Sequence, residues 1–108
     1  MSRFSAIARV PTAQGSKYLQ QLCKHWQHNL NVEFDAGQGR VIFPRDVKGA
    51  DHPGDGIATM TAGPDVLAVR IDATSDAQLT GLKGVLERHL DRFAFREAPL
   101  SFDWQDAD

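Results

Sequence analysis

Apolar and polar residues alternate along several short stretches of the chain, and each stretch predicts a β-strand with one buried face. The predicted strands are residues 4–10, 30–35, 40–43, 57–62 and 66–73. Pro11 ends the first strand, because proline has no amide hydrogen to donate. Turns at residues 37–39 (GQG) and 63–65 (GPD) join the other four strands into two hairpins.

Two longer stretches repeat apolar residues every three or four positions, which predicts two amphipathic helices. The apolar stripe of the first comprises Tyr18, Leu19, Leu22, Cys23, Trp26 and Leu30, and that of the second Leu79, Leu82, Val85, Leu86, Leu90 and Phe93. Thr12 is expected to cap the first helix, and Ser75 followed by Gln78 forms a capping box for the second. Gly81 and Gly84 lie opposite the second stripe, where glycine weakens a helix.

The order of these elements predicts an α+β fold in which an antiparallel sheet carries two helices on one face. The order is β-α-β-β-β-β-α plus an extended C-terminal tail, in which Phe102 or Trp104 reaches the core. Because apolar and polar residues alternate along the strands, the other face of the sheet should be exposed to solvent. This layout is analogous to that of TATA-binding protein and of the C-terminal domain of phosphohexomutases. Residues 44–56 (PRDVKGADHPGDG) have no periodicity and predict a surface loop.

Composition narrows the class of protein. The chain has 108 residues, 42% hydrophobic and 24% charged, which predicts a single domain over residues 1–108. A net charge of −2, with both signs scattered, argues against nucleic acid as the main partner. No apolar run approaches the roughly 20 residues of a membrane span, and no signal peptide is apparent, so we expect a cytoplasmic protein. The single cysteine is consistent with a reducing compartment.

Histidines are the first candidates for a functional site. His25 and His28, three positions apart on the first predicted helix, would lie side by side and could share a metal ion or a phosphate. A zinc or iron centre needs at least one further protein ligand, which His52 could supply if its loop folds back. The alternative is that His25 lies at the edge of the apolar stripe and His28 in solvent.

The second helix and the residues after it carry another candidate. His89 lies within the apolar stripe, where it either bonds a backbone carbonyl or an acid, or faces a pocket at the end of the first helix. The run 88–97 (RHLDRFAFRE) is rich in charge, and an Arg92 or Arg96 fork could hold a carboxylate or phosphate. The alternative use is mutual pairing on the surface, among Arg88, Asp91, Arg92 and Glu97.

Two other features have mainly structural interpretations. Cys23 falls in the buried stripe of the first helix, where its thiol is expected to be inert with a raised pKa. The open face of the sheet mixes both signs of charge with Ile7, Ile42 and Ile57. If these isoleucines were contiguous, they would mark a patch for a partner or for a second copy of the chain.

Several longer segments resemble a bacterial family, domain of unknown function 2218. They are ARVPT followed by SKYLQQLCKHWQH, then VEFDAGQGRVIF, HLDRFAFRE and the closing FDW, so the likeness covers nearly the whole chain. The resemblance implies a small bacterial protein without an assigned activity, sometimes joined to flavin-dependent siderophore-interacting reductase domains. It also implies a context near iron acquisition, and the family's histidine segments correspond to His25, His28 and His89.

The leading hypothesis is therefore a binding or accessory domain, for an iron complex or a redox partner, without a catalytic residue or cofactor of its own. The expected recognition residues are His25, His28, His89, Arg92 and Arg96, with His25 and His28 as candidate metal ligands. Two alternatives remain at this point: a metal-dependent enzyme that uses His25, His28 and His89, and a structural homodimer formed through the open sheet.

Overall fold

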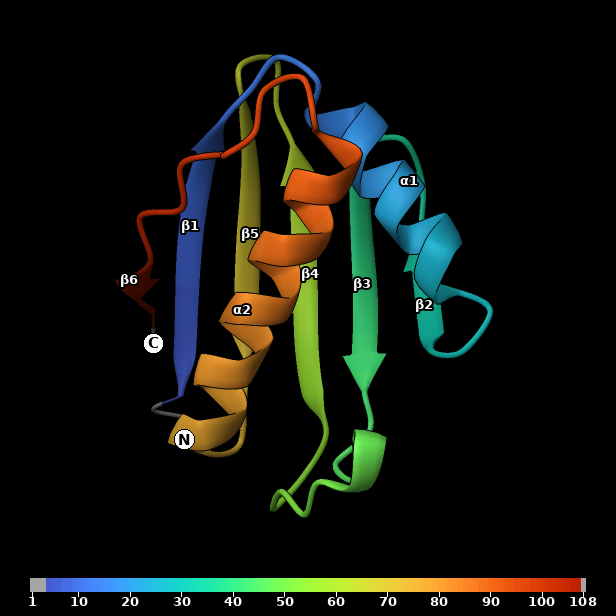
Figure 1. The fold of residues 1–108 in the computed structure, drawn as a ribbon, viewed down its shortest axis with the longest axis vertical. Helices are drawn as coiled ribbons and strands as arrows, with labels where there is room; N and C mark the ends of the chain where they lie inside the picture. Colours follow the sequence, from blue (N-terminus) through green and yellow to red (C-terminus); the bar gives the residue numbers. More distant parts are fainter. Residues whose placement is uncertain (1–3, 108) are drawn as a thin grey trace.

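Strands and helices form in the predicted order. The computed structural model describes residues 4–107, apart from the Lys48 side chain, and shows a sheet backed by two helices (Figure 1). The elements are β1 (Ser5–Pro11), α1 (Gly15–Trp26), β2 (Asn31–Phe34), β3 (Gln38–Phe43), the 3-10 turn η1 (Val47–Gly49), β4 (Gly56–Ala62), β5 (Val66–Asp72), α2 (Asp76–Phe93) and β6 (Gln105–Asp106). The predicted α+β class and element order are confirmed, while the analogy to TATA-binding protein stays a prediction.

The strands form one antiparallel sheet in the order β2-β3-β4-β5-β1-β6. The first strand lies between β5 and β6, so the first and last strands of the chain are neighbours in the sheet. The tail predicted only as extended chain makes β6, which pairs Ala6 with Asp106 and Ile7 with Gln105. The tail also packs on the core through Phe102 and Trp104, as predicted.

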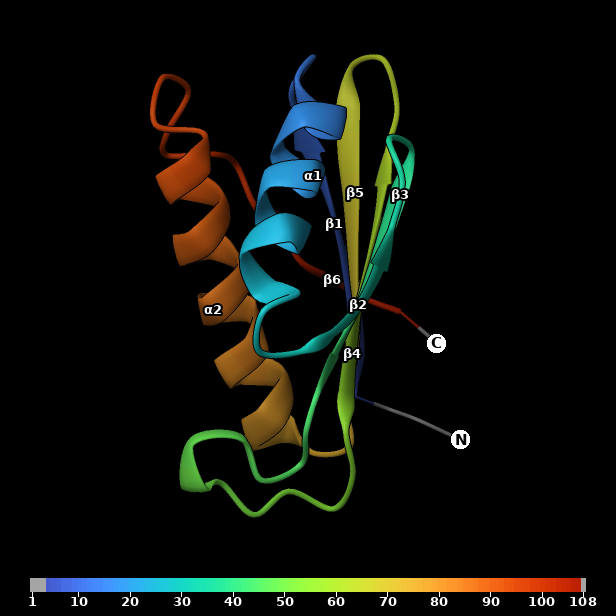
Figure 2. The ribbon, with the colours of Figure 1, turned by 90° about the vertical axis from the view of Figure 1, so that its right-hand side faces the viewer.

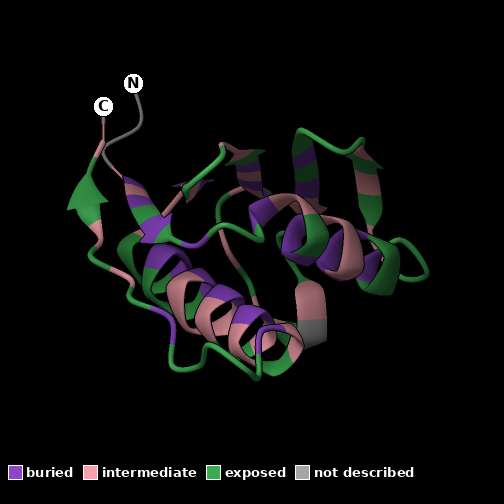
Figure 3. Ribbon diagram, turned by 90° about the horizontal axis from the view of Figure 1, so that it is seen from above, coloured by how far each residue is buried: buried purple, intermediate pink, exposed green. Residues whose placement is uncertain are grey.

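Both helices lie on the same face of the sheet, which confirms the central prediction from the alternating strands (Figure 2). Leu67, Val69 and Ile71 of β5 point to this face and are fully buried. The buried positions of the two helices turn toward the sheet (Figure 3). Helix α1 packs so closely that a side chain at Gly39 would place its Cβ 2.7 Å from the Cys23 Sγ atom.

The two helix starts differ from each other. Ser75 caps α2 as predicted, because its hydroxyl accepts a hydrogen bond from the Gln78 amide at 3.0 Å. The predicted Thr12 cap of α1 is wrong. The Thr12 hydroxyl accepts from the Gln14 amide at 3.0 Å in a local turn, and α1 begins after Gln14 without any side-chain cap.

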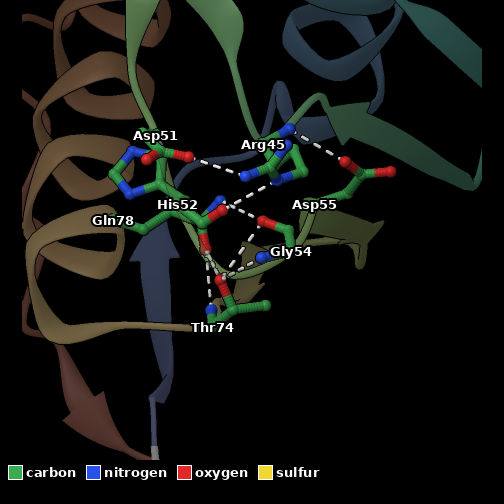
Figure 4. A network of polar contacts seen from close by, with 7 residues as sticks. All are labelled: Arg45, Asp51, His52, Gly54, Asp55, Thr74 and Gln78. Carbon is green, nitrogen blue, oxygen red and sulfur yellow. Dashed lines mark hydrogen bonds and ion pairs between the residues drawn. The ribbon is translucent and has the colours of Figure 1, made fainter.

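The loop between β3 and β4 is held in place by Arg45 (Figure 4). The Arg45 amide donates to Asp55 at 2.8 Å, and its guanidinium donates to the His52 carbonyl at 2.9 Å and to Asp51 at 2.6 Å. The His52 amide in turn donates to the Arg45 carbonyl at 3.0 Å. The predicted surface loop is therefore an ordered structure that closes on itself.

Candidate functional site

Two aromatic and two imidazole rings meet where the end of α1 crosses α2. The His89 ring lies 5.8 Å from His25 and 5.0 Å from Trp26, measured between ring centroids. Phe93, one helical turn beyond His89, lies 5.8 Å from His25. We call these four residues, His25, Trp26, His89 and Phe93, the aromatic seam. It joins the two helices at a boundary where Trp26 is buried and His25 is exposed.

His89 in the seam has one ring nitrogen in a hydrogen bond, and its other nitrogen has no hydrogen-bond partner among residues 4–107. Its Nδ1 atom lies 2.7 Å from the Val85 carbonyl oxygen. A carbonyl oxygen can only accept, so Nδ1 carries the hydrogen of this bond and the Nε2 atom remains for another partner. The predicted backbone-bonded histidine is thus present, and it also meets the end of α1.

The other two histidines lie apart from the seam. Helix α1 ends at Trp26, and His28 lies in the turn just beyond it, which the Leu30 amide closes on the Trp26 carbonyl at 2.8 Å. The side-by-side placement of His25 and His28 stays a prediction. His28 is exposed, while His52 is half-buried and belongs to the loop near the start of α2. Across residues 4–107, no group of three or more His, Cys, Asp or Glu side chains could hold a metal ion.

A hollow of about 250 Å³ adjoins the seam at Phe93. Its lining residues are Lys17, Tyr18, Phe93, Phe95 and Arg96, and we call it the basic hollow. Phe95 follows directly on the end of α2 and is 72% exposed, while the Arg96 guanidinium lies 5.7 Å from its ring centroid. The hollow therefore combines a flat apolar wall with two positive charges.

The positive charges around the basic hollow lack acidic partners in the described part of the chain. The ion pairs found between residues 4 and 107 are Arg40–Glu33, Arg45–Asp51 and Arg70–Asp72. The predicted mutual pairing of Arg88, Asp91, Arg92 and Glu97 is therefore wrong. Arg92 is exposed in the last turn of α2 and is among the unpaired arginines.

The acids of this region have other partners, which explains why the arginines are unpaired. Asp91 accepts a hydrogen bond from the Leu100 amide at 2.8 Å. Glu97 accepts a short hydrogen bond from the Tyr18 hydroxyl and another at 3.0 Å from the Thr12 hydroxyl. The hydrogen bond to Glu97 raises the pKa of Tyr18 above 10.0, and burial adds to this effect. Tyr18 is thus a protonated donor that fixes Glu97.

Sequence reasoning identified Arg92 and Arg96 but missed Lys17, Tyr18 and Phe95. Tyr18 was assigned only to the buried stripe, and its partner Glu97 lies 79 positions further along the chain. A usable signal was the pair Phe95-Arg96, in which an aromatic ring directly precedes a guanidinium just past an expected helix end. Cys23 is buried as predicted, and burial raises the pKa of its thiol to about 11.

The open face of the sheet does not gather the three isoleucines into one patch. Ile42 and Ile57 are paired neighbours on β3 and β4. On β5, Asp72 is the neighbour of Ile57 and Arg70 is the neighbour of Ile7. The Arg70 guanidinium donates to Asp72 at 3.0 Å, so an ion pair separates Ile7 from the other two isoleucines.

Comparison with known proteins assigns the chain to a family. Residues 7–105 match the family described as uncharacterised protein conserved in bacteria, domain of unknown function 2218. This chain belongs to that family. The resemblance found in the sequence segments is thus confirmed, and the family description assigns no activity. No helix between residues 4 and 107 has the length and apolar character required to cross a membrane.

A member of the same fold has been solved. The chain is similar to the NMR structure of PA4090 from Pseudomonas aeruginosa, with a TM-score of 0.73 and 26% sequence identity. The likeness covers 100% of this chain and 99% of the other. Among curated proteins, none matches the sequence.

Proposed function

We propose that this member of the family is a small binding or accessory domain, not an enzyme, whose recognition surface is the basic hollow with the adjoining aromatic seam. The observation that carries the proposal is the pairing of an exposed ring with available charge. Phe95 is 72% exposed, and Arg96 and Lys17 line the same hollow without an acidic partner among residues 4–107.

These features favour an anionic ligand with a flat apolar body. A guanidinium binds paired oxygen atoms through two parallel hydrogen bonds, which suits Arg96 to a carboxylate or a catecholate. Aromatic rings favour stacked or edge-on contact with another ring, which suits Phe93 and Phe95 to the body of the ligand. The available Nε2 atom of His89 offers one more polar contact along the seam.

An iron(III) catecholate complex is a ligand of this description, because it carries negative charge on aromatic rings. Such a ligand would agree with the iron and siderophore context that the family resemblance implies. We therefore propose iron-complex binding as the role of the surface. A redox partner protein with an acidic patch would use the same cations, and the experiment below separates the two.

The test is a calorimetric titration with the iron(III) complex of 2,3-dihydroxybenzoate. Loss of one charged hydrogen-bonding group is expected to weaken binding by about tenfold or more in Arg96→Ala and in Lys17→Ala. Arg88→Ala is the matched control, since Arg88 is an arginine of α2 that has no acidic partner among residues 4–107 and does not line the hollow. Its affinity should stay within about twofold of the native value.

Equal weakening by Arg88→Ala and Arg96→Ala would mean diffuse attraction of charge and would contradict a defined site. Absence of any binding by the complex would contradict the iron-complex role. If the complex does not bind but an acidic redox protein does, with the same dependence on Arg96, the surface serves a protein partner instead. His89→Ala should weaken the complex by less than Arg96→Ala, because an uncharged contact contributes less than a charged one.

A further inference from the structure

A second hollow, of about 160 Å³, lies at the opposite end of α2 from the basic hollow. Its floor is one stripe of the helix, Ala77, Gly81 and Val85, and its walls include Phe43 at the end of β3 with Val47 and Ala50 of the loop. We call it the apolar hollow. It uses no residue of the proposed anion site.

Gly81 keeps the floor of this hollow open. A Cβ atom at Gly81 would meet no other atom within 4 Å, whereas one at Gly56 would lie 2.6 Å from the Leu82 Cδ1 atom. A side chain would thus crowd its neighbours at position 56 but not at position 81. Alanine at position 81 would fit and would stabilise the helix, because glycine in a helix interior is less stable than alanine. The consequence of Gly81 is empty space directly over the helix.

The loop beside the hollow is fixed from both ends. Besides the bonds of Arg45, the buried Gln78 side chain donates to the Gly54 carbonyl at 2.9 Å and accepts from the Thr74 amide at 2.7 Å (Figure 4). The Gly54 amide donates to the Thr74 hydroxyl at 3.1 Å. A ligand would therefore meet preformed walls and would not have to order the loop.

The chemistry of the lining is almost wholly uncharged. No Lys, Arg, Asp or Glu is found among the described residues that line it, and the amide of Gln78 is already bonded to Gly54 and Thr74. The His52 imidazole is the polar group that remains, since its backbone amide and carbonyl bond Arg45 while its ring has no hydrogen-bond partner in the described part of the chain. A cavity of about 150 Å³ is large enough for one benzene ring.

We propose that the apolar hollow binds a small uncharged phenol, with the ring on the Gly81 floor beside Phe43 and the hydroxyl on the His52 imidazole. The volume sets the size at one ring, the lining excludes a charged ligand, and the one available polar group selects a hydroxyl. This is a second site that shares no lining residue with the proposed anion site, and the two adjoin where Phe43 contacts Trp26 of the aromatic seam.

The test is a titration of the ¹⁵N-labelled protein with p-cresol, followed by amide NMR shifts. Saturable shifts are expected at the amides of Phe43, Ala50 and Gly81, and toluene, which lacks the hydroxyl, should bind about threefold to tenfold more weakly. Benzoate should leave these amides unshifted, because burial of an unpaired charge is unfavourable. The proposal is overturned if p-cresol gives no saturable shift up to about 10 mM, the limit of weak single-ring binding.

Two glycine variants locate the site. Gly81→Leu fills the hollow and should weaken p-cresol at least about tenfold. Gly84→Leu makes the same change in the same helix, where a Cβ meets only the flexible end of Arg88 at 2.9 Å, and should bind as the native protein does. In His52→Ala, the affinity for p-cresol should fall to the affinity for toluene. Native affinity in a folded Gly81→Leu, or equal loss in both glycine variants, would overturn the site.

Discussion

The segments beside the two ends of α2 contain equal numbers of charged residues, but an arginine is paired with an acid at one end and not at the other. The loop 44–56 and the segment 88–97 each contain five charged residues. In the loop, the Arg45 guanidinium is paired with Asp51, and the hollow beside the loop is apolar. At the other end, Arg92 and Arg96 have no acidic partner among the described residues, and the hollow beside them is basic.

The difference comes from what the carboxylates bind. Asp51 binds the Arg45 guanidinium and so pairs with its charge, while Asp55 accepts from the Arg45 backbone amide. Neither Asp91 nor Glu97 binds a guanidinium of residues 4–107, because they accept hydrogen bonds from a backbone amide and from two hydroxyl groups, none of which carries a charge. Availability of charge at a surface therefore depends on the partners of the acids and cannot be deduced from the count of acids and bases.

The largest expected effect on stability is that of Gln78, whose side chain holds the loop 44–56, where Arg45 is paired with Asp51. Gln78→Leu keeps the buried volume but leaves the Thr74 amide without its partner, and the Gly54 carbonyl retains only the Thr74 hydroxyl at 3.2 Å. Buried polar groups left unsatisfied should lower the free energy of unfolding by about 3 kcal/mol, measured by urea denaturation. Amide exchange of residues 44–56 should become faster in this variant. Unchanged stability would mean that the loop is held by Arg45 alone.

A smaller effect on stability is expected at Tyr18, which binds Glu97 at the end of α2 where the arginines have no acidic partner among the described residues. Tyr18→Phe removes the hydroxyl that binds Glu97 and should lower the free energy of unfolding by about 2 kcal/mol. Glu97 is then free to pair with Arg96, so the affinity for the iron(III) complex should fall as well. Thr12→Val is the control for the second hydroxyl and should cost about 1 kcal/mol. Undiminished affinity in Tyr18→Phe would contradict the link between Tyr18 and the charge of the hollow.

The smallest effect is expected at Arg45, despite its several bonds. The Arg45 and Asp51 side chains are 52% and 89% exposed, so water screens and competes for their interaction. Arg45→Ala should therefore cost less than about 1 kcal/mol of unfolding free energy. Faster exchange of the loop amides should be visible by NMR nonetheless, and weaker p-cresol binding should accompany it. A loss of unfolding free energy as large as that in Gln78→Leu would contradict the conclusion that Gln78 holds the loop more strongly than Arg45 does.

Local patterns predicted the fold well because the decisive information lies within short segments. Strand alternation placed Leu67, Val69 and Ile71 on the covered face, and the spacing of Ser75 and Gln78 located a helix start. The placement of His28 beside His25 is a different kind of prediction, because it depends on where α1 ends and on the turn that follows, and it stays a prediction. A helix end is set by tertiary packing as well as by local propensity, and α1 stops at Trp26.

The candidate site was less predictable, because its key contacts join distant parts of the chain. The hydrogen bond between Tyr18 and Glu97 spans 79 positions, and that between Thr12 and Glu97 spans 85. No periodicity in the sequence signals such a pair. The sequence indicates Arg96 as a recognition residue, but it also leaves mutual pairing with Glu97 open, and it does not bring Lys17 and Tyr18 to the same hollow.

The most direct test of the central claim, that Tyr18 holds Glu97 away from the arginines, is an ultraviolet titration of tyrosine. The chain has one tyrosine, so the absorbance change reports Tyr18 alone. Hydrogen bonding to Glu97 raises the pKa of Tyr18 above 10.0 in the folded state, so the stabilisation is complete below pH 10.0 and is lost as pH rises through the raised value. The account predicts ionisation above pH 10.0 in the native protein and closer to pH 10.0 in Glu97→Gln. Ionisation at or below pH 10.0 in the native protein, or no change in Glu97→Gln, would contradict it.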